Sequence, residues 1–461
     1  MASSGHHPPF DHTDGLRMQA PALSAPINNA GLIAFIRCCI VIGSLLLIWL
    51  TFEPFANLQN TSLTEIATGQ LATTYITFGS LALLAVALCA SDSLPALRSL
   101  GTPVNIAFVA WMLINIVASH LPGLSLQRFT LTASVTALAF MIPLLPSSRA
   151  QLNLCLAISA GLLLAICYLG LLLIPDYAIH SIRDAVEANL DGDWRGAFSH
   201  KNIAAPVMAI LIYLGLYLIR TELTVAGILI TAAAVIFMLN SGGKSSTGFC
   251  VAILLLVQIV SRVRGFAMKC AICFAPLLLM NVLAVGSAIS PALAGIVATL
   301  PIDTTFTGRT GIWEFALTGF FGRPIFGYGY GAFWNNPANQ TTIGSAFEWA
   351  TDASHSHNGY LELALSIGFP GLMLALAALL YMPLRDYQRI QDGDQNQPLA
   401  HFLLTVWLFG IYLSTMETFL LDKQNPIWFL FVIAVAGLHY LSRFRLKPDA
   451  RDDRIAAQTS A

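Results

Sequence analysis

The chain has 461 residues, of which 56% are hydrophobic and only 10% are charged. A soluble domain carries about 25% charged residues, so this composition excludes an ordinary water-soluble fold and indicates a protein of the lipid bilayer. The formal net charge of -1 leaves no basic field, which excludes nucleic acid as a partner.

The two ends of the chain differ from its middle. Residues 1–30 are rich in Ser, Pro, His and Gly and hold no apolar run, which predicts a disordered cytoplasmic tail. We expect no cleavable signal peptide, because the first apolar run starts only near Gly31 and no small-residue cleavage site follows it. Residues 443–461 are rich in charged residues and are predicted to form a second cytoplasmic tail.

The eight cysteines all lie in or beside apolar segments, where a disulfide framework has nothing to stabilise. Cys270 and Cys273 have the spacing of a metal-binding pair. No second pair and no nearby histidine completes a ligand set, so we interpret them as small apolar residues on a helix and predict no metal site.

Twelve apolar stretches are candidate membrane crossings, for which about 20 residues are needed. They predict an all-α polytopic membrane protein whose transmembrane domain covers residues 31–442. The stretches lie near residues 31–51, 71–90, 103–120, 128–145, 153–175, 202–219, 223–240, 247–261, 269–289, 359–382, 401–417 and 427–442.

The orientation of these stretches is predicted from Lys and Arg, which accumulate on the cytoplasmic side of membrane proteins. With the N-terminus in the cytoplasm, fifteen of the 23 basic residues lie inside. The long connection at 290–358, between the ninth and tenth stretches, then lies outside, and its length predicts short helices within it. Eight basic residues contradict the orientation signal and need another explanation: Arg128, Arg183, Arg195, Lys201, Lys244, Arg309, Arg323 and Lys423.

Two histidines, His355 and His357, close this long loop directly before an apolar helix that we expect to run to about Met382. Asn358 is a candidate N-cap of that helix, so the free amide groups and the positive end of the helix dipole face the loop and favour an anion there. A group that carries a proton at this boundary indicates chemistry on an amphiphile with a phosphate head. The alternative is that both histidines are interfacial polar residues without a catalytic task.

Four segments carry a resemblance to a known family. They are Trp194-Arg195-Gly196-Ala197-Phe198-Ser199-His200-Lys201-Asn202, Asn240-Ser241-Gly242-Gly243-Lys244-Ser245-Ser246-Thr247, Thr307-Gly308-Arg309-Thr310-Gly311-Ile312-Trp313-Glu314, and His357-Asn358 followed by Gly368-Phe369-Pro370-Gly371. As an ordered set, spanning about 190–440, they resemble the O-antigen ligase and Wzy-type polysaccharide polymerase superfamily, and especially its exopolysaccharide polymerase branch. The family often has Arg at the position of Lys244, so the two-pronged grip of a guanidinium is lost there.

This resemblance implies a GT-C-like glycosyltransferase of the cytoplasmic (inner) membrane. The donor would be a glycan on undecaprenyl pyrophosphate, and the reaction would occur on the outer, periplasmic side without metal, nucleotide sugar or other cofactor. The leading expectation is a polymerase that joins lipid-linked repeat units into exopolysaccharide or O-antigen, beside a flippase and a chain-length regulator. Two alternatives are a ligase that moves a finished glycan onto lipid A core, and a flippase for lipid-linked sugar.

The transfer needs a base for the acceptor hydroxyl and cations for the leaving pyrophosphate. Histidine, with an ordinary pKa of about 6.5, suits the first task, and we predict that His357 is this base or orients the acceptor. Arg309 is predicted to hold the pyrophosphate, because a guanidinium contacts two phosphate oxygens at once. Further candidates for substrate binding, each of which could instead be an interfacial anchor, are Arg195, His200, Lys201, Lys244, His355 and Asn358.

Three smaller questions stay open at this level. The carboxylate that assists His357 could be any of Glu53, Glu314, Glu348 and Asp352. The Asp191-Gly192-Asp193 segment resembles a metal clamp of nucleotide-sugar enzymes, but two acids around a glycine are more often a plain turn. The glycine-rich segment 327–331 is not a dinucleotide motif, because no strand precedes it, and it forms either close backbone packing or an aromatic turn that contacts sugar.

Overall fold

The computed structural model describes residues 29–51, 54–58, 71–184, 190–334, 336, 339, 350, 353–390 and 396–444. Over these residues the secondary structure is helical, apart from one isolated bridge between Ile179 and Trp194. The predicted all-α class is therefore confirmed for the described part of the chain. The expectations for the tails at 1–30 and 443–461 lie almost wholly outside the described residues.

Each of the twelve predicted apolar stretches forms a helix. These helices are α1 (Asn29–Leu50), α3 (Leu71–Asp92), α5 (Pro103–Ala118), α6 (Pro122–Met141), α7 (Arg149–Leu173), α9 (Lys201–Leu218), α10 (Thr224–Asn240), α11 (Lys244–Arg262), α12 (Phe266–Ser287), α16 (Gly359–Leu376), α18 (Gln397–Leu413) and α19 (Pro426–Leu441). Among the described residues, seven helical segments are long and apolar enough to cross a membrane, and α5, α10, α18 and α19 are apolar but shorter. The count of twelve crossings therefore stays a prediction.

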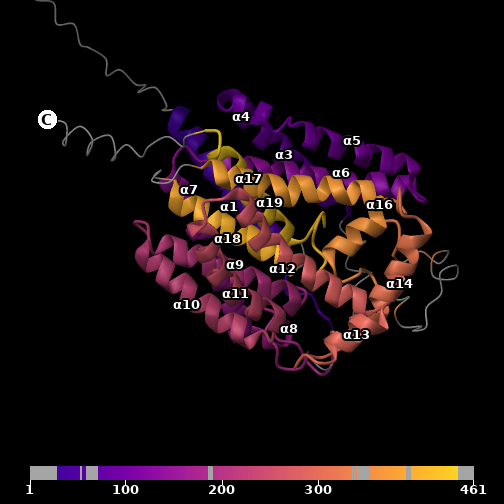
Figure 1. Ribbon diagram of the computed structural model, residues 1–461. Helices are drawn as coiled ribbons and strands as arrows, with labels where there is room; N and C mark the ends of the chain where they lie inside the picture. Colours follow the sequence, from indigo (N-terminus) through magenta and orange to yellow (C-terminus); the bar gives the residue numbers. More distant parts are fainter. Residues whose placement is uncertain are drawn as a thin grey trace, which may run out of the picture.

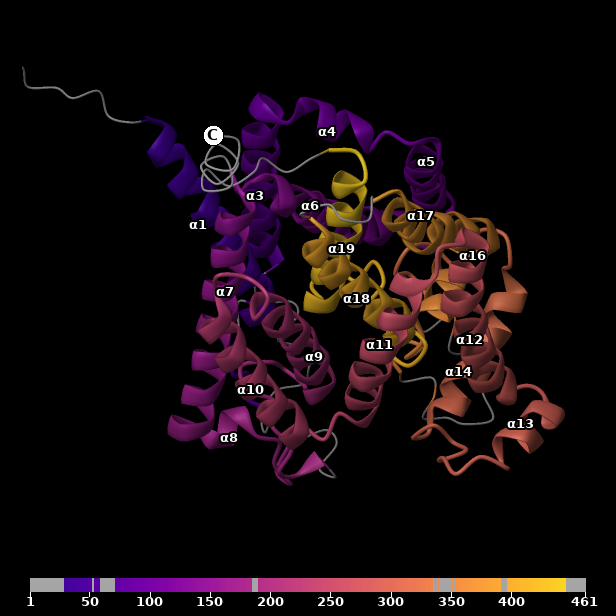
Figure 2. The same ribbon diagram turned by 60° about the vertical axis from the view of Figure 1, so that its left-hand side comes forward.

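Helices α18 and α19 form the centre of the bundle. Every residue of α19 is buried, and the large side chains of Trp407, Phe409, Trp428 and Phe431 fill the space around the two helices. A helix that is apolar on all sides belongs in an interior, which explains this position. Figure 2 shows the pair in the middle, with α1, α3 and α7 on one side and α12, α14 and α16 on the other.

The peripheral helices turn apolar side chains outward. Leu83 on α3 is 74% exposed, Val117 on α5 is 81% exposed, and Leu278 on α12 is 65% exposed. In water such surfaces would drive aggregation, whereas acyl chains solvate them well. The outward apolar faces and the apolar helices together describe a multi-pass membrane protein.

The helix expected to run unbroken from residue 359 to about 382 is interrupted at Gly368, whose φ of 71° and ψ of 178° are not helical. Beyond the break, α16 continues through a π-helical turn, Ala377–Tyr381, into α17 (Met382–Arg389). The backbone N–H of Phe369 donates to the carbonyl of Pro324 at 2.7 Å, and Trp111 Nε1 donates to the carbonyl of Ile367 at 2.9 Å. Irregular backbone within a membrane bundle is stable where other protein groups satisfy its polar atoms in this way.

The glycine-rich segment 327–331 packs against this break. The backbone N–H of Tyr328 donates to the carbonyl of Leu365, and that of Gly329 donates to the carbonyl of Ser366, both at 3.0 Å. A Cβ atom on Gly327 would lie 2.5 Å from the Leu365 oxygen, so a larger residue does not fit. Close backbone packing is therefore the reason for this glycine pattern, which the sequence had left open.

The long connection between α12 and α16 holds two short helices, α13 (Pro291–Val297) and α14 (Arg309–Gly322), as expected from its length (Figure 1). Its side of the membrane stays a prediction. Helix α14 begins after Gly308, which has a left-handed φ of 83° and provides no side-chain cap. Gly308 thus occupies the N-cap position, and neither of the nearby threonines, Thr307 and Thr310, caps the helix.

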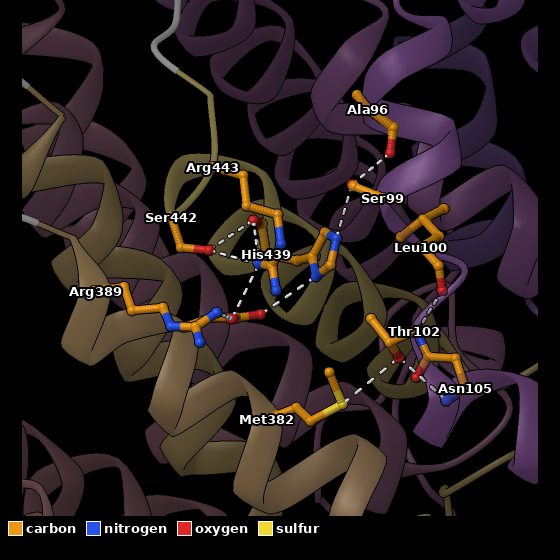
Figure 3. A network of polar contacts seen from close by, with 11 residues as sticks. Ala96, Ser99, Leu100, Thr102, Asn105, Met382, Arg389, His439, Ser442 and Arg443 are labelled. Atoms are coloured by element: carbon orange, nitrogen blue, oxygen red, sulfur yellow. Dashed lines mark hydrogen bonds and ion pairs between the residues drawn. The ribbon is translucent and has the colours of Figure 1, made fainter.

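A network of charged groups ties the far ends of α17 and α19 to the short helix α4 (Leu94–Ser99) (Figure 3). The buried Asp386 carboxylate forms an ion pair with Arg443 at 2.9 Å and lies 3.2 Å from Nδ1 of His439. His439 Nε2 lies 2.9 Å from the hydroxyl oxygen of Ser99, which itself donates to the Ala96 carbonyl. These contacts join the C-terminal ends of α17 and α19 to α4 through side chains.

Candidate active site

The predicted base and the predicted pyrophosphate-binding residue meet on one carboxylate. Arg309, the first residue of α14, donates from Nη2 to Oε1 of Glu417 at 2.8 Å. Nδ1 of His357 lies 3.6 Å from the other oxygen, Oε2. The three side chains are between 14% and 27% exposed. Glu417 lies in the connection between α18 and α19, so three segments that are distant in sequence converge here.

The charge of Glu417 is set by its two neighbours. Burial alone would raise the pKa of this carboxyl group, but the nearby His357 and Arg309 outweigh burial and hold its pKa below the ordinary value. The carboxylate is therefore ionised at neutral pH. Its distance from His357 exceeds hydrogen-bond length, yet it favours the tautomer with the proton on Nδ1. In that tautomer Nε2 carries the lone pair that accepts a proton.

The loop that carries His357 is held in a strained conformation. His357 has a φ of 51°, in the left-handed region that residues with a side chain rarely adopt. Trp313 of α14 donates from Nε1 to the carbonyl of Ser356 at 2.9 Å, and the backbone N–H of Ser356 donates to Glu362 at 3.0 Å. Trp334 donates to the same Glu362 carboxylate. Strain of this kind persists only where the surroundings fix it, and it is frequent at functional sites.

Asn358 caps α16, as the sequence predicted. Its Oδ1 accepts from the backbone N–H groups of Tyr360 and Leu361 at 3.0 and 2.9 Å. Its Nδ2 donates to Oδ1 of Asn281 at 2.9 Å and to the carbonyl of Thr415 at 3.0 Å. The buried side chain thus uses its polar groups within the protein, which gives it a positioning role next to His357 rather than a free group for substrate.

His355 stacks against His357, with the ring centroids 4.0 Å apart. Its Nδ1 accepts from the backbone N–H of His357 at 3.3 Å. Burial, together with the neighbouring His357, lowers the pKa of His355 to about 3. The ring is therefore neutral at physiological pH, and because Nδ1 is an acceptor, the proton sits on Nε2.

A cavity of about 350 Å³ lies beside these residues, between the loop at 176–201, the start of α9 and the connection before α19. Most of its lining residues carry polar side chains, although apolar atoms form the larger share of its surface, and such a mixed wall suits the hydroxyl groups and ring faces of a sugar. The polar lining residues are His180, Ser199, His200, Asn202, Ser354, His355, His357, Glu417, Thr418, Asp422 and Asn425. None of the described lining residues is Lys or Arg, and Arg309 is connected to the cavity through its contact with the lining residue Glu417.

Arg195 does not reach this cavity. It is only 1% exposed, and its guanidinium donates to the carbonyl of Phe198 at 3.0 Å and to that of Ala56 at 2.8 Å. Arg195 is one of the basic residues that contradict the predicted orientation. Two carbonyl groups inside the protein, rather than an anionic lipid head group, explain its position. The arrangement makes Arg195 a cross-link between the loop at 176–201 and the segment after α1.

The two lysines of the predicted set also lie away from the cavity. Lys201 forms an ion pair with Asp193 at 2.5 Å, and Lys244 is exposed on the first turn of α11. A Cβ atom on Gly242 would lie 2.4 Å from the Asp193 carboxylate, and the backbone N–H of Trp194 donates to the carbonyl of Asn240 at 2.9 Å, so two of the family-like segments contact each other directly. Asp191 accepts from the backbone N–H of Ile182 at 3.1 Å, and both acids of the Asp-Gly-Asp segment are thus used within the loop.

His200 is the N-cap of α9 and accepts on Nδ1 from the backbone N–H of Asn202 at 3.0 Å. Its ring stands 5.0 Å from that of His180, measured between centroids. His180 was not predicted as a site residue. Its Nδ1 lies 3.0 Å from Asp184, its Nε2 accepts from the backbone N–H of Lys201 at 3.2 Å, and it thereby fixes the loop against α9.

Glu417 is the functional candidate that sequence reasoning missed. The predicted apolar stretch 401–417 has Glu417 as its last residue, whereas α18 ends at Leu413 and leaves Glu417 in the following loop. Of the carboxylates that we had considered instead, Glu314 is on α14 and does not line the cavity. The others, Glu53, Glu348 and Asp352, lie outside the described residues.

The fold and the site together define a multi-pass membrane protein with a polar cavity, a histidine and an arginine coupled through a carboxylate. Residues 207–376 match the family model described as O-Antigen ligase, which supports the resemblance of this chain to the O-antigen ligase and Wzy-type superfamily. The match includes Arg309 and His357, ends before Glu417, and is shorter than the expected span of 190–440. No curated protein matches this chain.

Proposed function

We propose that this protein is a glycosyltransferase that joins oligosaccharide repeat units, each carried on undecaprenyl pyrophosphate, into exopolysaccharide or O-antigen. The observation that carries the proposal is the convergence of His357 and Arg309 on Glu417 beside a polar cavity. This transfer needs a proton acceptor and a cation. Here both groups contact the same carboxylate, that of Glu417.

In the proposed reaction, a hydroxyl group of the acceptor glycan attacks the anomeric carbon of the donor glycan. A new glycosidic bond forms while the bond from that carbon to the pyrophosphate oxygen breaks. His357 takes the hydroxyl proton on Nε2, and the Nδ1 side faces Glu417, which stabilises the imidazolium. The pyrophosphate leaves on its lipid with the bonding electrons.

Arg309 is proposed to hold this leaving group. A guanidinium has five N–H donors, and one contact to Glu417 at 2.8 Å leaves others for phosphate oxygens. Among the predicted cations, Arg309 alone contacts the carboxylate that faces His357, which favours it over Arg195, Lys201 and Lys244 for this role. The positive charge comes from a side chain, so the proposal includes no metal ion.

The proposed setting is the inner membrane, with the cavity on the periplasmic side, where a flippase would deliver the donor and a regulator would set chain length. The matched family model is described as O-Antigen ligase, and transfer of a finished glycan onto lipid A core is therefore the second candidate. Both reactions use the same donor chemistry and differ only in the acceptor.

The test uses cells that make the polymer and carry His357→Ala or Arg309→Ala. We expect both variants to reach the membrane while single lipid-linked repeats accumulate on the outer face. His401→Ala and Arg323→Ala are matched controls, because neither residue lines the cavity or contacts Glu417, and they should retain polymer of normal length.

The identity of the accumulated lipid separates the hypotheses. Polymer of normal length in the His357→Ala strain would refute the catalytic role of that residue. Accumulation of full-length lipid-linked polymer would indicate the ligase, and accumulation on the cytoplasmic face would indicate the flippase. Purified protein should also remain active in a chelator, and activity that returns only with divalent ions would contradict a metal-free site.

A further inference from the structure

A second cavity, of about 430 Å³, lies along α19 and reaches the C-terminal end of that helix. Both α1 and α19 run along it, from Arg37 to Trp49 and from Leu441 to Leu430. At 1.5 Å per residue these spans are about 18 and about 16 Å long. Half of a bilayer core of about 30 Å has the same depth, so the cavity matches the reach of one lipid chain in one leaflet.

The wall of this cavity is more apolar than that of the cavity beside His357. Its long sides are aliphatic, and Leu152, Leu156, Leu211, Leu403 and Ile433 are among the residues that form them. A hydrocarbon chain fits such a wall, whereas a sugar would leave its hydroxyl groups without partners.

Polar groups gather at one end of the cavity. Tyr440 is only 4% exposed and lines the cavity, and its hydroxyl group has no hydrogen-bond partner among the described residues. The same holds for Nε of Arg37, whose Nη2 contacts Asp92. Buried polar groups almost always have a partner, and both of these donors belong to residues that line the cavity.

The charged residues at this end of the cavity indicate which kind of head group the ligand has. Arg37 and Asp92 form an ion pair in which the Asp92 side chain is 55% exposed and the Arg37 side chain 11% exposed. The pair adds no net charge, and it presents one cation and one anion side by side. A head group with a phosphate and an ammonium matches both, whereas an anionic head group would place a second negative charge beside the half-exposed Asp92 carboxylate.

We propose that this cavity binds one acyl chain of a zwitterionic phospholipid, with the phosphate at Arg37 and Tyr440 and the ammonium at Asp92. The site is distinct from the proposed transfer site, since none of its lining residues lines the other cavity. It makes a membrane lipid an integral part of the bundle beneath α19.

Trp49 provides a direct probe, because it lines the cavity and is only 2% exposed. The full-length protein is placed in nanodiscs of phosphatidylethanolamine with brominated acyl chains, and tryptophan fluorescence is recorded for the wild type and for Trp49→Phe. The difference between the two is the Trp49 signal, which we expect to fall at least twofold relative to nanodiscs of unbrominated lipid. An unchanged Trp49 signal would refute the acyl-chain site, because lipid outside the bundle does not touch this buried ring.

The head-group assignment is tested by mass spectrometry of lipid retained on detergent-purified protein. Tyr440→Phe keeps the ring and removes the unpartnered hydroxyl group, so we expect roughly fivefold less phosphatidylethanolamine. Tyr412→Phe, which removes a buried hydroxyl group that donates to the Cys273 carbonyl, is the matched control and should retain the wild-type amount. Equal retention in both variants, or a preference for phosphatidylglycerol in the wild type, would overturn the zwitterionic assignment.

Discussion

Glu417 accepts a hydrogen bond from Arg309 at 2.8 Å although the two residues are 108 positions apart in sequence. The same carboxylate faces Nδ1 of His357. A proposed base and a proposed phosphate-binding cation therefore cannot move independently, because each is held by the charge that holds the other.

Replacement of Glu417 by glutamine should show whether activity requires the negative charge of this side chain or only its size. Glu417→Gln keeps the size of the side chain and its acceptor oxygen but removes the negative charge that orients His357. General base catalysis contributes about 100-fold to 10,000-fold, so we expect a loss of activity of at least about 100-fold in a single-turnover assay with a lipid-linked donor. Glu314→Gln is the control and should stay near wild type. Equal activity of the Glu417 and Glu314 variants would remove Glu417 from the site.

The decrease in folding stability at acidic pH should depend on His355. Its pKa is about 3 in the folded protein, against about 6.5 in an unfolded chain. Between these pH values the unfolded chain binds a proton that the folded protein does not, so stability is fully present above pH 6.5 and falls as the pH decreases. The slope from this group is at most about 1.4 kcal/mol per pH unit.

Thermal unfolding in detergent between pH 7.5 and pH 4.5 measures this effect. His355→Asn removes the titrating ring and retains an acceptor for the backbone N–H of His357. Its melting temperature should therefore change less over this range than that of the wild type. Two parallel profiles would show that His355 titrates normally in the folded protein.

The sequence predicts the helices well because their signal is local. An apolar run of sufficient length is visible without its neighbours, and each of the twelve stretches became a helix. The break at Gly368 was not predicted, since it depends on backbone groups at 324–329 that lie about 40 positions away and replace the lost helical hydrogen bonds. Helix length also limited the prediction, because four of the apolar helices are shorter than a full crossing.

The sequence predicted only those site residues whose side-chain type and motif indicate a chemical role by themselves. His357 and Arg309 came from motifs, and the structure brings them together on one carboxylate. The role of Arg195 was harder to infer, because one of its partners, the carbonyl of Ala56, is 139 positions away. A positive charge on the unexpected side of a membrane thus has two explanations, a bound anion or buried carbonyl groups, and sequence alone does not distinguish them.

The loop that carries His357 should depend on one indole group. Trp313→Phe removes the hydrogen bond to the carbonyl of Ser356, and Trp407→Phe removes an equivalent bond to the carbonyl of Leu379 in the bundle core. Each variant should lose about 1 kcal/mol of stability. Only Trp313→Phe should also lose activity, roughly tenfold, because it alone loosens the loop. A similar loss of activity in both variants would show that stability, and not loop geometry, limits the reaction.

The broken helix should tolerate no side chain at position 368. In Gly368→Ala the new Cβ atom would lie 1.9 Å from the carbonyl oxygen of Ile325, at a φ of 71° that alanine rarely adopts. The backbone must shift to relieve both problems, so we expect a loss of more than about 3 kcal/mol or failure to accumulate in the membrane. Gly79→Ala in α3 is the matched control, because no atom lies within 4 Å of its added Cβ and alanine favours a helix by about 1 kcal/mol. Thermal unfolding of both variants decides the matter, and equal melting temperatures would contradict a break that only glycine can form.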